Sequence, residues 1–373
     1  MGYNEILENF RQEGRFREIP PHRANQGFLD LSNNDYMGLA ARQSQFRDMF
    51  AERFPDVSMS ASASRLLASD QDVFSQLESK LENLYGRPSL LFNSGYHANV
   101  GTVSALNIPG TLFLPDKLIH ASAIDGLMMR NTQMERWRHN DTAHLRRIIE
   151  KKRGEFDRII VMAESVYSMD GDMAPLQELV ALRREFTEIM LYIDEAHAFG
   201  VFGEKGLGVA ESLGLIEEID IIVGTFGKAC ASSGAFVSTS ATLRDYLVNA
   251  ARSLIFSTAI PPACAAWTLM MTEELEKMSE ERARLEEIST EFRGIIEEIT
   301  GKECVSRSQI VPLMIGDAVK AVEMSQRLLE QGVIALAIRR PTVPPGGERI
   351  RFSLNAGLTG DDIHKVAEII RSL

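Results

Sequence analysis

The chain has 373 residues and a mass of 41.6 kDa, with 45% hydrophobic and 25% charged residues. This composition is typical of a globular protein with a sizeable core, and it excludes disordered, collagenous and coiled-coil classes. The 40 basic and 52 acidic residues give a net charge of −12 and a pI near 5.2. Proteins that grip a phosphate backbone non-specifically are usually basic, so we expect no nucleic-acid partner.

The N-terminus, the cysteines and the uncharged stretches together predict a cytoplasmic protein. Residues 1–15 carry charges from the start and lack the apolar stretch of a signal peptide. The three cysteines form no C-x-x-C pair and are expected to be reduced thiols. Residues 88–115 and 253–272 lack Asp, Glu, Lys and Arg, but Pro, Ser and Thr interrupt them. Buried core fits these two stretches better than a membrane span does, so no membrane partner is expected.

Five short apolar runs in chain order predict strands, at 89–92, 111–114, 158–163, 189–193 and 220–224. Helical patterns lie between several of them, at 142–152 and 175–186. Continuous apolar strands that alternate with amphipathic helices indicate a parallel sheet covered on both faces. We therefore expect an α/β fold.

The pattern changes near residue 270. Residues 271–300 have apolar residues at helical spacing and predict one long helix, whose 10 acidic and 4 basic residues indicate a solvated outer face. The runs at 333–338 and 349–354 suggest a smaller α+β domain. We expect an N-terminal segment at 1–45, a large domain at 46–255 and a small C-terminal domain at 256–373.

Two nucleotide-binding interpretations fail on spacing. The DEAH sequence at 194–197 follows a predicted strand, as in some helicases, but that interpretation needs a phosphate loop G-x-x-x-x-G-K-[ST]. Before Lys228 the loop has Ile222 where Gly is required, and Ala229 follows it where Ser or Thr is required. The glycines at 200–208 do not follow the dinucleotide pattern either. No metal site is expected.

An acid and a lysine remain, each at the carboxyl end of a predicted parallel strand, where open α/β sheets bind ligands. Asp194 ends one strand, and Lys228 lies in the small-residue loop GTFGKACASSG after another. Alone, Lys228 could be a solvated loop lysine. Together, a Schiff-base lysine and an acid for a pyridinium nitrogen are the minimum requirement for pyridoxal phosphate (PLP) chemistry. Residues 93–99 add a turn and a helix start, whose amides favour a phosphate.

With these residues, the chain resembles the α-oxoamine synthases, a family of fold-type I PLP enzymes. Within this family it resembles the 8-amino-7-oxononanoate synthase branch most. Nine segments carry the resemblance: LSNNDYMGL (31–39), FNSGYHAN (92–99), DKLIHAS (116–122), RWRHND (136–141), SVYSMDGDMAPL (165–176), IDEAHAFG (193–200), GTFGKACASSGAF (224–236), ARSLIFSTAIPPA (251–263) and AIRRPTVPPGGERIRFSLNA (337–356). Their order and spacing are specific. The resemblance implies a mostly parallel seven-stranded sheet in the large domain and a homodimer with its active site at the interface.

The resemblance also implies roles around the cofactor ring. Lys228 would carry the cofactor as an imine, and Asp194 would pair with the pyridinium nitrogen. His197 would hydrogen-bond the phenolic oxygen, with Ser168 nearby. His120 would stack on one face of the ring.

The phosphate group would be held by a second set of residues. The resemblance assigns it to the amides of Gly95 and Tyr96 and to the Thr225 hydroxyl. Ser257 or Thr258 would reach it from the partner subunit.

Substrate contacts complete the implied site. Arg351 would bind the amino-acid carboxylate as a two-pronged donor, with Asn34 beside it. Thr342 and either Arg17 or Arg15 would contact the acyl thioester.

The implied reaction is the decarboxylative condensation of L-alanine with a pimeloyl thioester, on coenzyme A or acyl carrier protein, to give 8-amino-7-oxononanoate in biotin synthesis. Two alternatives stay open: a sister α-oxoamine synthase that uses glycine or another acyl-CoA, such as glycine C-acetyltransferase, and a non-catalytic or NTP-binding α/β protein. Three departures from the family pattern, at 57–69, Phe199 and 229–232, bear on the choice of substrate because they are expected to line or flank the pocket.

Overall fold

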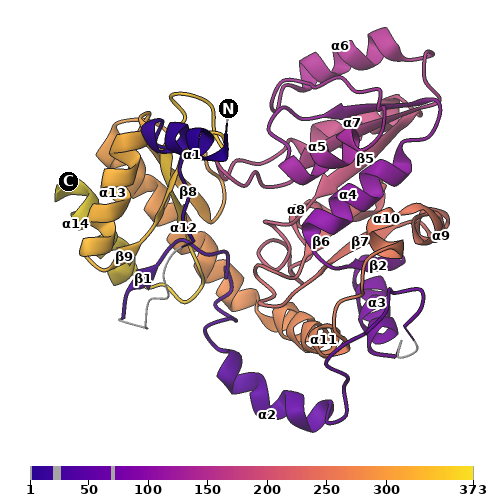
Figure 1. Ribbon diagram of the computed structural model, residues 1–373, viewed down its shortest axis with the longest axis horizontal. Coiled ribbons are helices and arrows are strands. Elements are labelled where there is room, and N and C mark those ends of the chain that lie inside the picture. Colours follow the sequence, from indigo (N-terminus) through magenta and orange to yellow (C-terminus); the bar gives the residue numbers. More distant parts are fainter. Residues whose placement is uncertain (1, 20–26, 69–71, 373) are drawn as a thin grey trace. The chain divides into compact units, whose positions relative to one another are not determined.

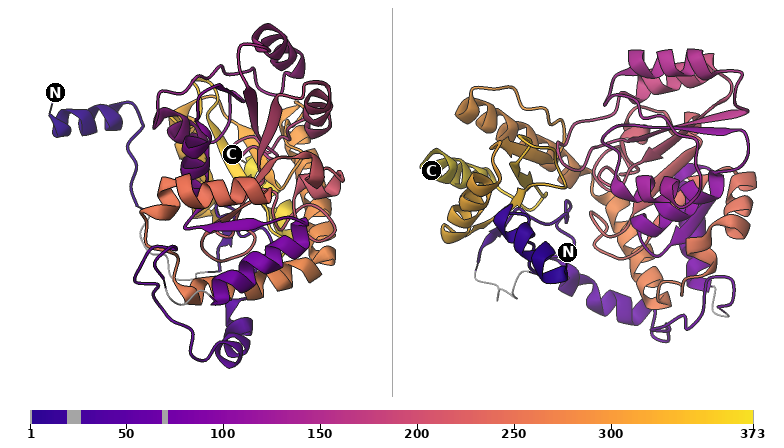
Figure 2. Two further views of the ribbon diagram at one scale, coloured as in Figure 1. Left: turned by 90° about the vertical axis from the view of Figure 1, so that its right-hand side faces the viewer. Right: turned by 45° about the horizontal axis from the view of Figure 1, so that its top comes forward.

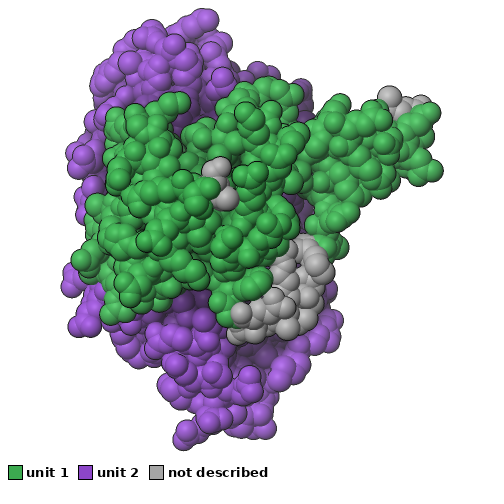
Figure 3. Space-filling model, turned by 90° about the vertical axis from the view of Figure 1, so that its left-hand side faces the viewer, with its two compact units in different colours: residues 1–34, 169–172, 283–373 green, residues 35–168, 173–282 purple. Residues whose placement is uncertain are grey.

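The computed structural model describes residues 2–19, 27–68 and 72–372 (Figure 1). It divides into a smaller unit of residues 1–34, 169–172 and 283–373 and a larger unit of residues 35–168 and 173–282 (Figure 3). The division differs from the expected boundaries after residues 45 and 255. Helix α11 (Pro262–Lys277) stays with the larger unit because it packs on α3 (Asp72–Tyr85), a pairing that local composition does not reveal.

The larger unit is built on a six-stranded sheet in the order β2-β7-β6-β5-β4-β3. Its strands are β2 (Ser89–Phe92), β3 (Thr111–Pro115), β4 (Arg158–Glu164), β5 (Ile189–Asp194), β6 (Ile221–Thr225) and β7 (Ala235–Thr239). Strands β3 to β6 are parallel, and β7 is antiparallel to both of its neighbours.

All five expected runs are strands, but the expected count of seven is not reached in the part of the chain that the structure describes. The segment that lies beside the edge strand β3 pairs with it only through isolated bridges, Phe113 with Met134 and Asp116 with Trp137. These two bridges do not extend into a ladder, so the segment adds no seventh strand to the edge.

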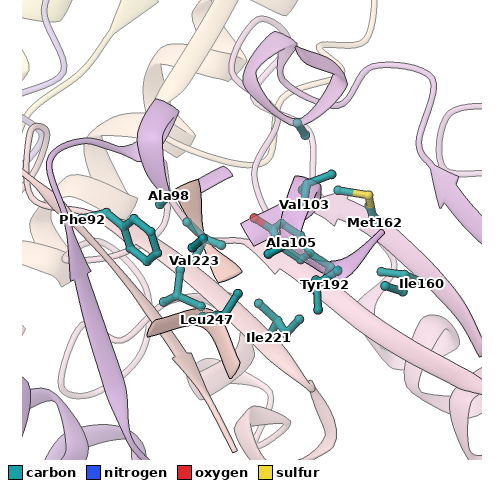
Figure 4. Close-up of a cluster of buried hydrophobic side chains, with 14 of the residues drawn as sticks. Phe92, Ala98, Val103, Ala105, Ile160, Met162, Tyr192, Ile221, Val223 and Leu247 are labelled. Carbon is teal, nitrogen blue, oxygen red and sulfur yellow. The ribbon is translucent and has the colours of Figure 1, made fainter. Parts of the chain in front are cut away.

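One face of this sheet is buried under α4 (Gly95–Leu106), α5 (Ala121–Met128), α9 (Ala241–Ala250) and α10 (Arg252–Ile255). Alternate strand residues such as Phe92, Ile160, Tyr192 and Val223 share this face, since side chains in a strand alternate between faces (Figure 4). They pack against Val103 and its neighbours on α4. The core therefore fixes α4 over the strands whose carboxyl ends carry the candidate site.

The opposite face of the sheet is covered differently. Tyr85 at the end of α3 packs against Phe236 of β7, with ring centroids 5.3 Å apart, and α7 (Leu176–Glu185) lies against β5. The unit also contains α2 (Gln43–Arg53), α6 (Thr142–Lys152), α8 (Val209–Ser212) and a 3-10 turn at Ile216–Glu218. Helices α6 and α7 coincide with the two helical patterns expected between strands.

The smaller unit holds an antiparallel sheet in the order β10-β11-β8, formed by Leu336–Ile338, Arg349–Ser353 and Ile310–Met314. A parallel pair joins β1 (Leu29–Asp30) to β9 (Val333–Ile334). Its helices are α13 (Ala318–Glu330), α14 (Gly360–Ser372), most of α12 (Ser279–Thr300) and α1 (Tyr3–Gln12). Helix α1 buries none of its residues and stands away from the rest of its unit (Figure 2).

The single helix expected over 271–300 is interrupted. Helix α11 ends at Lys277 and α12 begins at Ser279, because Met278 leaves the helical backbone conformation, with ψ at 43°. Arg282 donates to the Leu275 carbonyl at 2.6 Å, and the same carbonyl accepts from the Met278 amide at 3.2 Å where the helix ends. No helix among residues 2–19, 27–68 and 72–372 is long and apolar enough to span a membrane.

Candidate functional site

The carboxyl ends of three parallel strands place polar residues on the face that α4 covers. Glu164 ends β4 directly opposite Asp194 of β5, and Asp194 pairs in register with Val223 of β6. Thr225 lies two residues beyond Val223 and therefore points to the same face. This edge of a parallel sheet is where open α/β folds bind ligands.

Lys228 is held in the turn between β6 and β7. The turn is closed by the Phe226 amide, which donates to the Gly234 carbonyl at 3.0 Å, and by the Ser232 amide, which donates to the Phe226 carbonyl at 2.9 Å. Gly234 has φ of 103°, a conformation that side chains rarely adopt, and it lets the chain enter β7. The fold thus fixes the lysine backbone beside the end of β6.

The Lys228 amine contacts a histidine of the same unit. Its Nζ lies 2.8 Å from Nε2 of His197, whose Nδ1 lies 2.6 Å from the Tyr36 hydroxyl. His197 and Tyr36 are buried. The imidazole therefore links an amine and a phenol, and it can pass or hold a proton between them.

Asp194 is buried and fixed by two donors. The Ala196 amide donates to its Oδ1 at 2.9 Å, and the Asn99 side chain donates to its Oδ2 at 2.8 Å. Only 6% of Asp194 is exposed. A buried carboxylate that is held in this way can stabilise a cation, such as a protonated ring nitrogen, that is placed beside it.

The start of α4 offers an anion site. Ser94 caps the helix and accepts from the His97 amide at 3.2 Å, which leaves the amides of Gly95 and Tyr96 in the first turn without an acceptor inside the helix. A Cβ at Gly95 would lie 3.7 Å from the Thr225 Cβ, so the Thr225 side chain is next to these amides. Helix-end amides and a hydroxyl are suited to a phosphate.

Glu164 lies near two loops of the site. The backbone amides of His120 and Ser168 face its carboxyl at the end of β4 and lower its pKa. Burial, reinforced by the nearby Asp194, raises the pKa of Glu164 well above its usual value, and Lys228 opposes the rise. A raised pKa favours the neutral form of Glu164, which reduces the repulsion between the two carboxyl groups that end the neighbouring strands β4 and β5.

The remaining expected phosphate contacts lie near the same helix start. The Asn93 amide group donates to Ser257 Oγ at 3.1 Å and to the Thr258 carbonyl at 2.5 Å within one chain. Tyr96 is 50% exposed and donates from its hydroxyl to Asp125 at 2.8 Å. The backbone of Tyr96 thus suits the anion site, while its ring points to a different partner.

The expected substrate contacts belong to the smaller unit and form two pairs there. Arg351 is buried on β11 and donates to Asn34 Oδ1 at 3.2 Å. Arg17 donates to the Thr342 hydroxyl at 2.9 Å, whereas Arg15 pairs with Glu13 at 2.7 Å. Of the two arginines that the sequence left open, Arg17 is the one beside Thr342.

Three residues of the larger unit contribute to the site although the sequence reasoning missed them: Tyr36, Asn99 and Glu164. Tyr36 and Asn99 lie inside the motifs 31–39 and 92–99, and Glu164 directly precedes the motif 165–176. The signal was therefore present in the motifs. The hydrogen bonds of Tyr36 and Asn99 cross 161 and 95 residues of sequence, which local patterns do not report.

The departures from the family pattern have packing roles within the larger unit. Phe199 is buried against the rings of Phe226 and Phe236, at centroid distances of 6.1 and 5.1 Å, and so belongs to the core. Cys230 is buried, which raises the pKa of its thiol to about 12 and excludes a nucleophilic role at neutral pH. The segment 57–68 is joined to the 258–263 region through the Ala259 and Ala263 amides; Ser69 lies outside the described residues.

Comparisons with known proteins give matches over most of the chain. The family model for aminotransferase class I and II matches residues 26–370. A protein from Haemophilus ducreyi named 8-amino-7-oxononanoate synthase is 44% identical over 372 residues, which cover 98% of this chain and 95% of that protein.

Two solved structures extend the likeness to three dimensions. A serine palmitoyltransferase variant from S. paucimobilis with a bound PLP–myriocin aldimine is 31% identical, with a TM-score of 0.86 over 92% of this chain and 87% of that one. An 8-amino-7-oxononanoate synthase from Francisella tularensis is 27% identical, with a TM-score of 0.77 over 93% of this chain and 98% of that one.

Proposed function

This chain belongs to the aminotransferase class I and II family, and we propose that it is a PLP-dependent acyltransferase that makes 8-amino-7-oxononanoate for biotin synthesis. The substrates would be L-alanine and a pimeloyl thioester on coenzyme A or acyl carrier protein, and the products would include CO2 and the free thiol. The observation that carries the proposal is the grouping of Lys228, His197 and Asp194 at one edge of the sheet, beside the anion site of α4.

The residues of the larger unit fit the cofactor. Lys228 supplies the amine that would bind the aldehyde carbon, and Asp194 is held as a buried acceptor for a ring N–H. The amides of Gly95 and Tyr96 with Thr225 suit the phosphate, and the glycine at position 95 leaves the approach open. His120, Ser168, Ser257 and Thr258 are proposed as the further contacts to ring and phosphate.

When bound, PLP supplies an electron sink for the carbanion at the amino-acid Cα. Lys228 would take and return the Cα proton at its Nζ as general base and acid. His197, 2.8 Å from Nζ, orients this amine and offers it a proton acceptor. Asp194 favours the protonated ring nitrogen, which strengthens the electron sink.

Arg351 is proposed to bind the amino-acid carboxylate. The guanidinium is buried and is oriented by Asn34, and a planar fork of donors matches a carboxylate. Holding the carboxylate would set the direction of the Cα–H bond, which must be placed accurately for proton transfer. Thr342 and Arg17, which hydrogen-bond each other, are proposed to contact the acyl thioester.

A sister α-oxoamine synthase is the second candidate function. The observation in its favour is the TM-score of 0.86 to a serine palmitoyltransferase, against 0.77 to the oxononanoate synthase structure. The sequence identity of 44% to the Haemophilus ducreyi protein favours the first function. Only the choice of amino acid and acyl chain separates the two.

The deciding experiment supplies the purified protein with PLP and tests L-alanine against glycine, each with pimeloyl-CoA and acetyl-CoA. We expect the fastest thiol release with L-alanine and pimeloyl-CoA, and a product with the mass of 8-amino-7-oxononanoate. A preference for glycine with acetyl-CoA would overturn the biotin assignment. A parallel arm with pimeloyl acyl carrier protein identifies the natural carrier.

A variant pair tests the cofactor assignment itself. Borohydride reduction of the PLP-treated protein should attach the cofactor covalently to Lys228, as read by peptide mass. Lys228→Ala should abolish the adduct, while the exposed Lys302→Ala should retain it. Absence of an adduct on Lys228 in the unaltered protein would refute PLP catalysis.

A further inference from the structure

A buried chain of hydrogen bonds in the larger unit runs from Asp194 to His120. Asn99 on α4 is 2% exposed and donates from Nδ2 both to Asp194 Oδ2, at 2.8 Å, and to Ser122 Oγ, at 2.9 Å. Ser122 is fully buried, and its Oγ lies 2.7 Å from Nδ1 of His120. Tyr192 approaches from β5 and donates to Asn99 Oδ1 at 2.6 Å. Residues of β5, α4 and α5 thus meet in one network.

The partners of Asn99 fix the orientation of its amide. An ionised Asp194 can only accept, so the NH2 group must face it. Tyr192 is buried, and burial together with Asp194 raises its pKa well above the ordinary value, so the phenol keeps its proton and donates to Oδ1. The second N–H of Asn99 is therefore directed at Ser122, whose hydroxyl oxygen acts as the acceptor.

The partners of His120 fix the position of its proton. His120 caps α5, and its Nδ1 accepts from the Ser122 amide at 3.3 Å, so this nitrogen carries no proton. Since Ser122 Oγ already accepts from Asn99, its own proton is available to the same Nδ1. Two donors at Nδ1 leave Nε2 as the protonated nitrogen of a neutral ring.

The charged groups around His120 come from several elements. Burial and Lys228 lower the pKa of His120, while Asp194 and Asp125 oppose this. Glu164, from β4, faces the backbone amide of His120, and burial raises the pKa of its carboxyl. The surroundings thus agree with the neutral imidazole that the hydrogen bonds require.

We propose that Asn99 and Ser122 are positioning residues that hold His120 as the neutral Nε2–H tautomer and couple its orientation to that of Asp194. The tautomer is a property of the chain without cofactor. The effect of the tautomer on turnover rests on the proposed function, because the proposed PLP enzyme has His120 facing the cofactor ring and Asp194 facing the pyridinium nitrogen.

Nitrogen-15 NMR of cofactor-free protein labelled at histidine tests the tautomer directly. The chain has seven histidines, and His120→Asn identifies the signals of His120. We expect an unprotonated Nδ1 in the unaltered protein. Ser122→Ala should transfer part of the proton population to Nδ1 and move the titration midpoint of His120 to higher pH, because a donor at Nδ1 stabilises only the neutral ring.

Matched variants separate positioning from general damage. Ser122→Thr keeps the hydroxyl and should restore the tautomer and the midpoint. Ser104→Ala removes a buried hydroxyl on α4 that donates only to the Gly101 carbonyl, and should change neither. Asn99→Leu keeps the branched shape without the hydrogen bonds and should shift the His120 signals in the same direction as Ser122→Ala, although the hydrogen bonds of Asn99 go to Ser122, Asp194 and Tyr192. This variant also decides the matter if Ser122→Ala does not fold.

The kinetic arm measures kcat/KM against pH. Loss of one hydrogen bond worth about 1 kcal/mol corresponds to a roughly fivefold fall in kcat/KM for Ser122→Ala. The pH profile of kcat/KM should also shift in Ser122→Ala, and Ser122→Thr should restore it. Unchanged His120 spectra and midpoint in both Ser122→Ala and Asn99→Leu would overturn the proposal. If the spectra respond but no condensation activity exists in any variant, the proposed function fails and the positioning role stands.

Discussion

Buried charged side chains are the single residues with the largest consequences in this protein, because each of them needs a partner to offset its lost hydration. Asp194 has two hydrogen-bond donors, and Arg351 has Asn34. Glu195 follows Asp194 in sequence but points to the other face of the sheet, where it binds the Val209 and Ala210 amides and the Ser165 hydroxyl. Asp194 thus belongs to the candidate site, whereas the adjacent Glu195 holds the surrounding backbone in place.

Replacing Arg351 tests the proposed carboxylate contact. Arg351→Ala should raise KM for the amino acid and lower kcat, with a combined loss in kcat/KM of about ten- to a hundredfold, as for a charged hydrogen bond of roughly 1.5–3 kcal/mol. Arg351→Lys keeps the charge but loses the fork and should fall in between. The exposed Arg371→Ala is the control. An unchanged amino-acid KM in Arg351→Ala would refute the carboxylate role.

Glu195 predicts a specific pH dependence of stability. Burial raises its pKa from 4.5 to about 7 in the folded chain, so the folded state binds a proton that the unfolded state has lost between these values. The contribution of Glu195 to the free energy of unfolding is therefore fully present below pH 4.5. It is lost as pH rises through 7, and the loss amounts to about 3 kcal/mol. Glu195→Gln should remove this dependence.

The measurement is the free energy of unfolding in urea between pH 5 and 8. The stability of the unaltered protein should fall relative to Glu195→Gln as pH rises, whereas the exposed Glu303→Gln should follow the unaltered protein. Parallel pH profiles for the protein and Glu195→Gln would show that Glu195 does not titrate as described.

At the scale of elements, the position of Lys228 depends on how β6 meets β7. Gly224 lies in β6 beneath the Phe236 ring, which also contacts Phe199 and Phe226 at centroid distances of 5.1 and 5.4 Å. A glycine is needed here because a side chain would overlap this ring. The aromatic cluster therefore holds the strand that leads into the Lys228 turn.

Gly224→Ala tests this packing. The added Cβ would overlap the Phe236 ring, and buried neighbours cannot move away, so we expect a destabilisation of roughly 1–3 kcal/mol. Gly294→Ala on α12 meets no atom within 4 Å and should stabilise by about 0.5–1 kcal/mol through helix propensity. Equal effects of the two variants on the urea midpoint would contradict the overlap.

The elements also show how far sequence patterns reach. The runs at 89–92 and 189–193 were predictable as strands because fully buried strands are continuous apolar segments. Strand β7 and the break at Met278 were not predicted. Strand β7 follows a loop rich in small residues, and the hydrogen bond from Arg282 back to the Leu275 carbonyl is not visible in a hydrophobic pattern. Pairing partners and caps are set by contacts that a local window does not contain.

At the scale of the whole molecule, the proposed homodimer assigns Ser257 and Thr258 to the phosphate of the partner subunit. Within one chain, Ser257 Oγ lies 3.1 Å from Asn93 Nδ2, close in sequence to Gly95. Subunit complementation distinguishes a phosphate contact from the partner subunit from a contact within one chain. A mixture of Lys228→Ala chains with chains altered to alanine at Ser257 and Thr258 should regain activity, because one site of a mixed dimer has every unaltered residue.

The double variant should be weakly active alone, and Lys228→Ala inactive. Light scattering should report twice 41.6 kDa for each preparation and for the mixture. If activity does not return after the subunits have demonstrably exchanged, the phosphate contact lies within one chain and the shared site is refuted.

The sequence by itself determined the α/β class, the family and the residue types at the site, because these depend on hydrophobic periodicity and on motifs whose order and spacing are visible along the chain. Only the tertiary structure decided which groups meet: Lys228 with His197 and Tyr36, Asp194 with Asn99, and Arg17 rather than Arg15 with Thr342. It also assigned Phe199 to the core and limited the sheet to six strands in the described residues. The reason is physical: a hydrogen bond or a ring contact depends on distances of a few ångströms between segments that can be more than a hundred residues apart, and the packing of the sheet and its helices sets those distances.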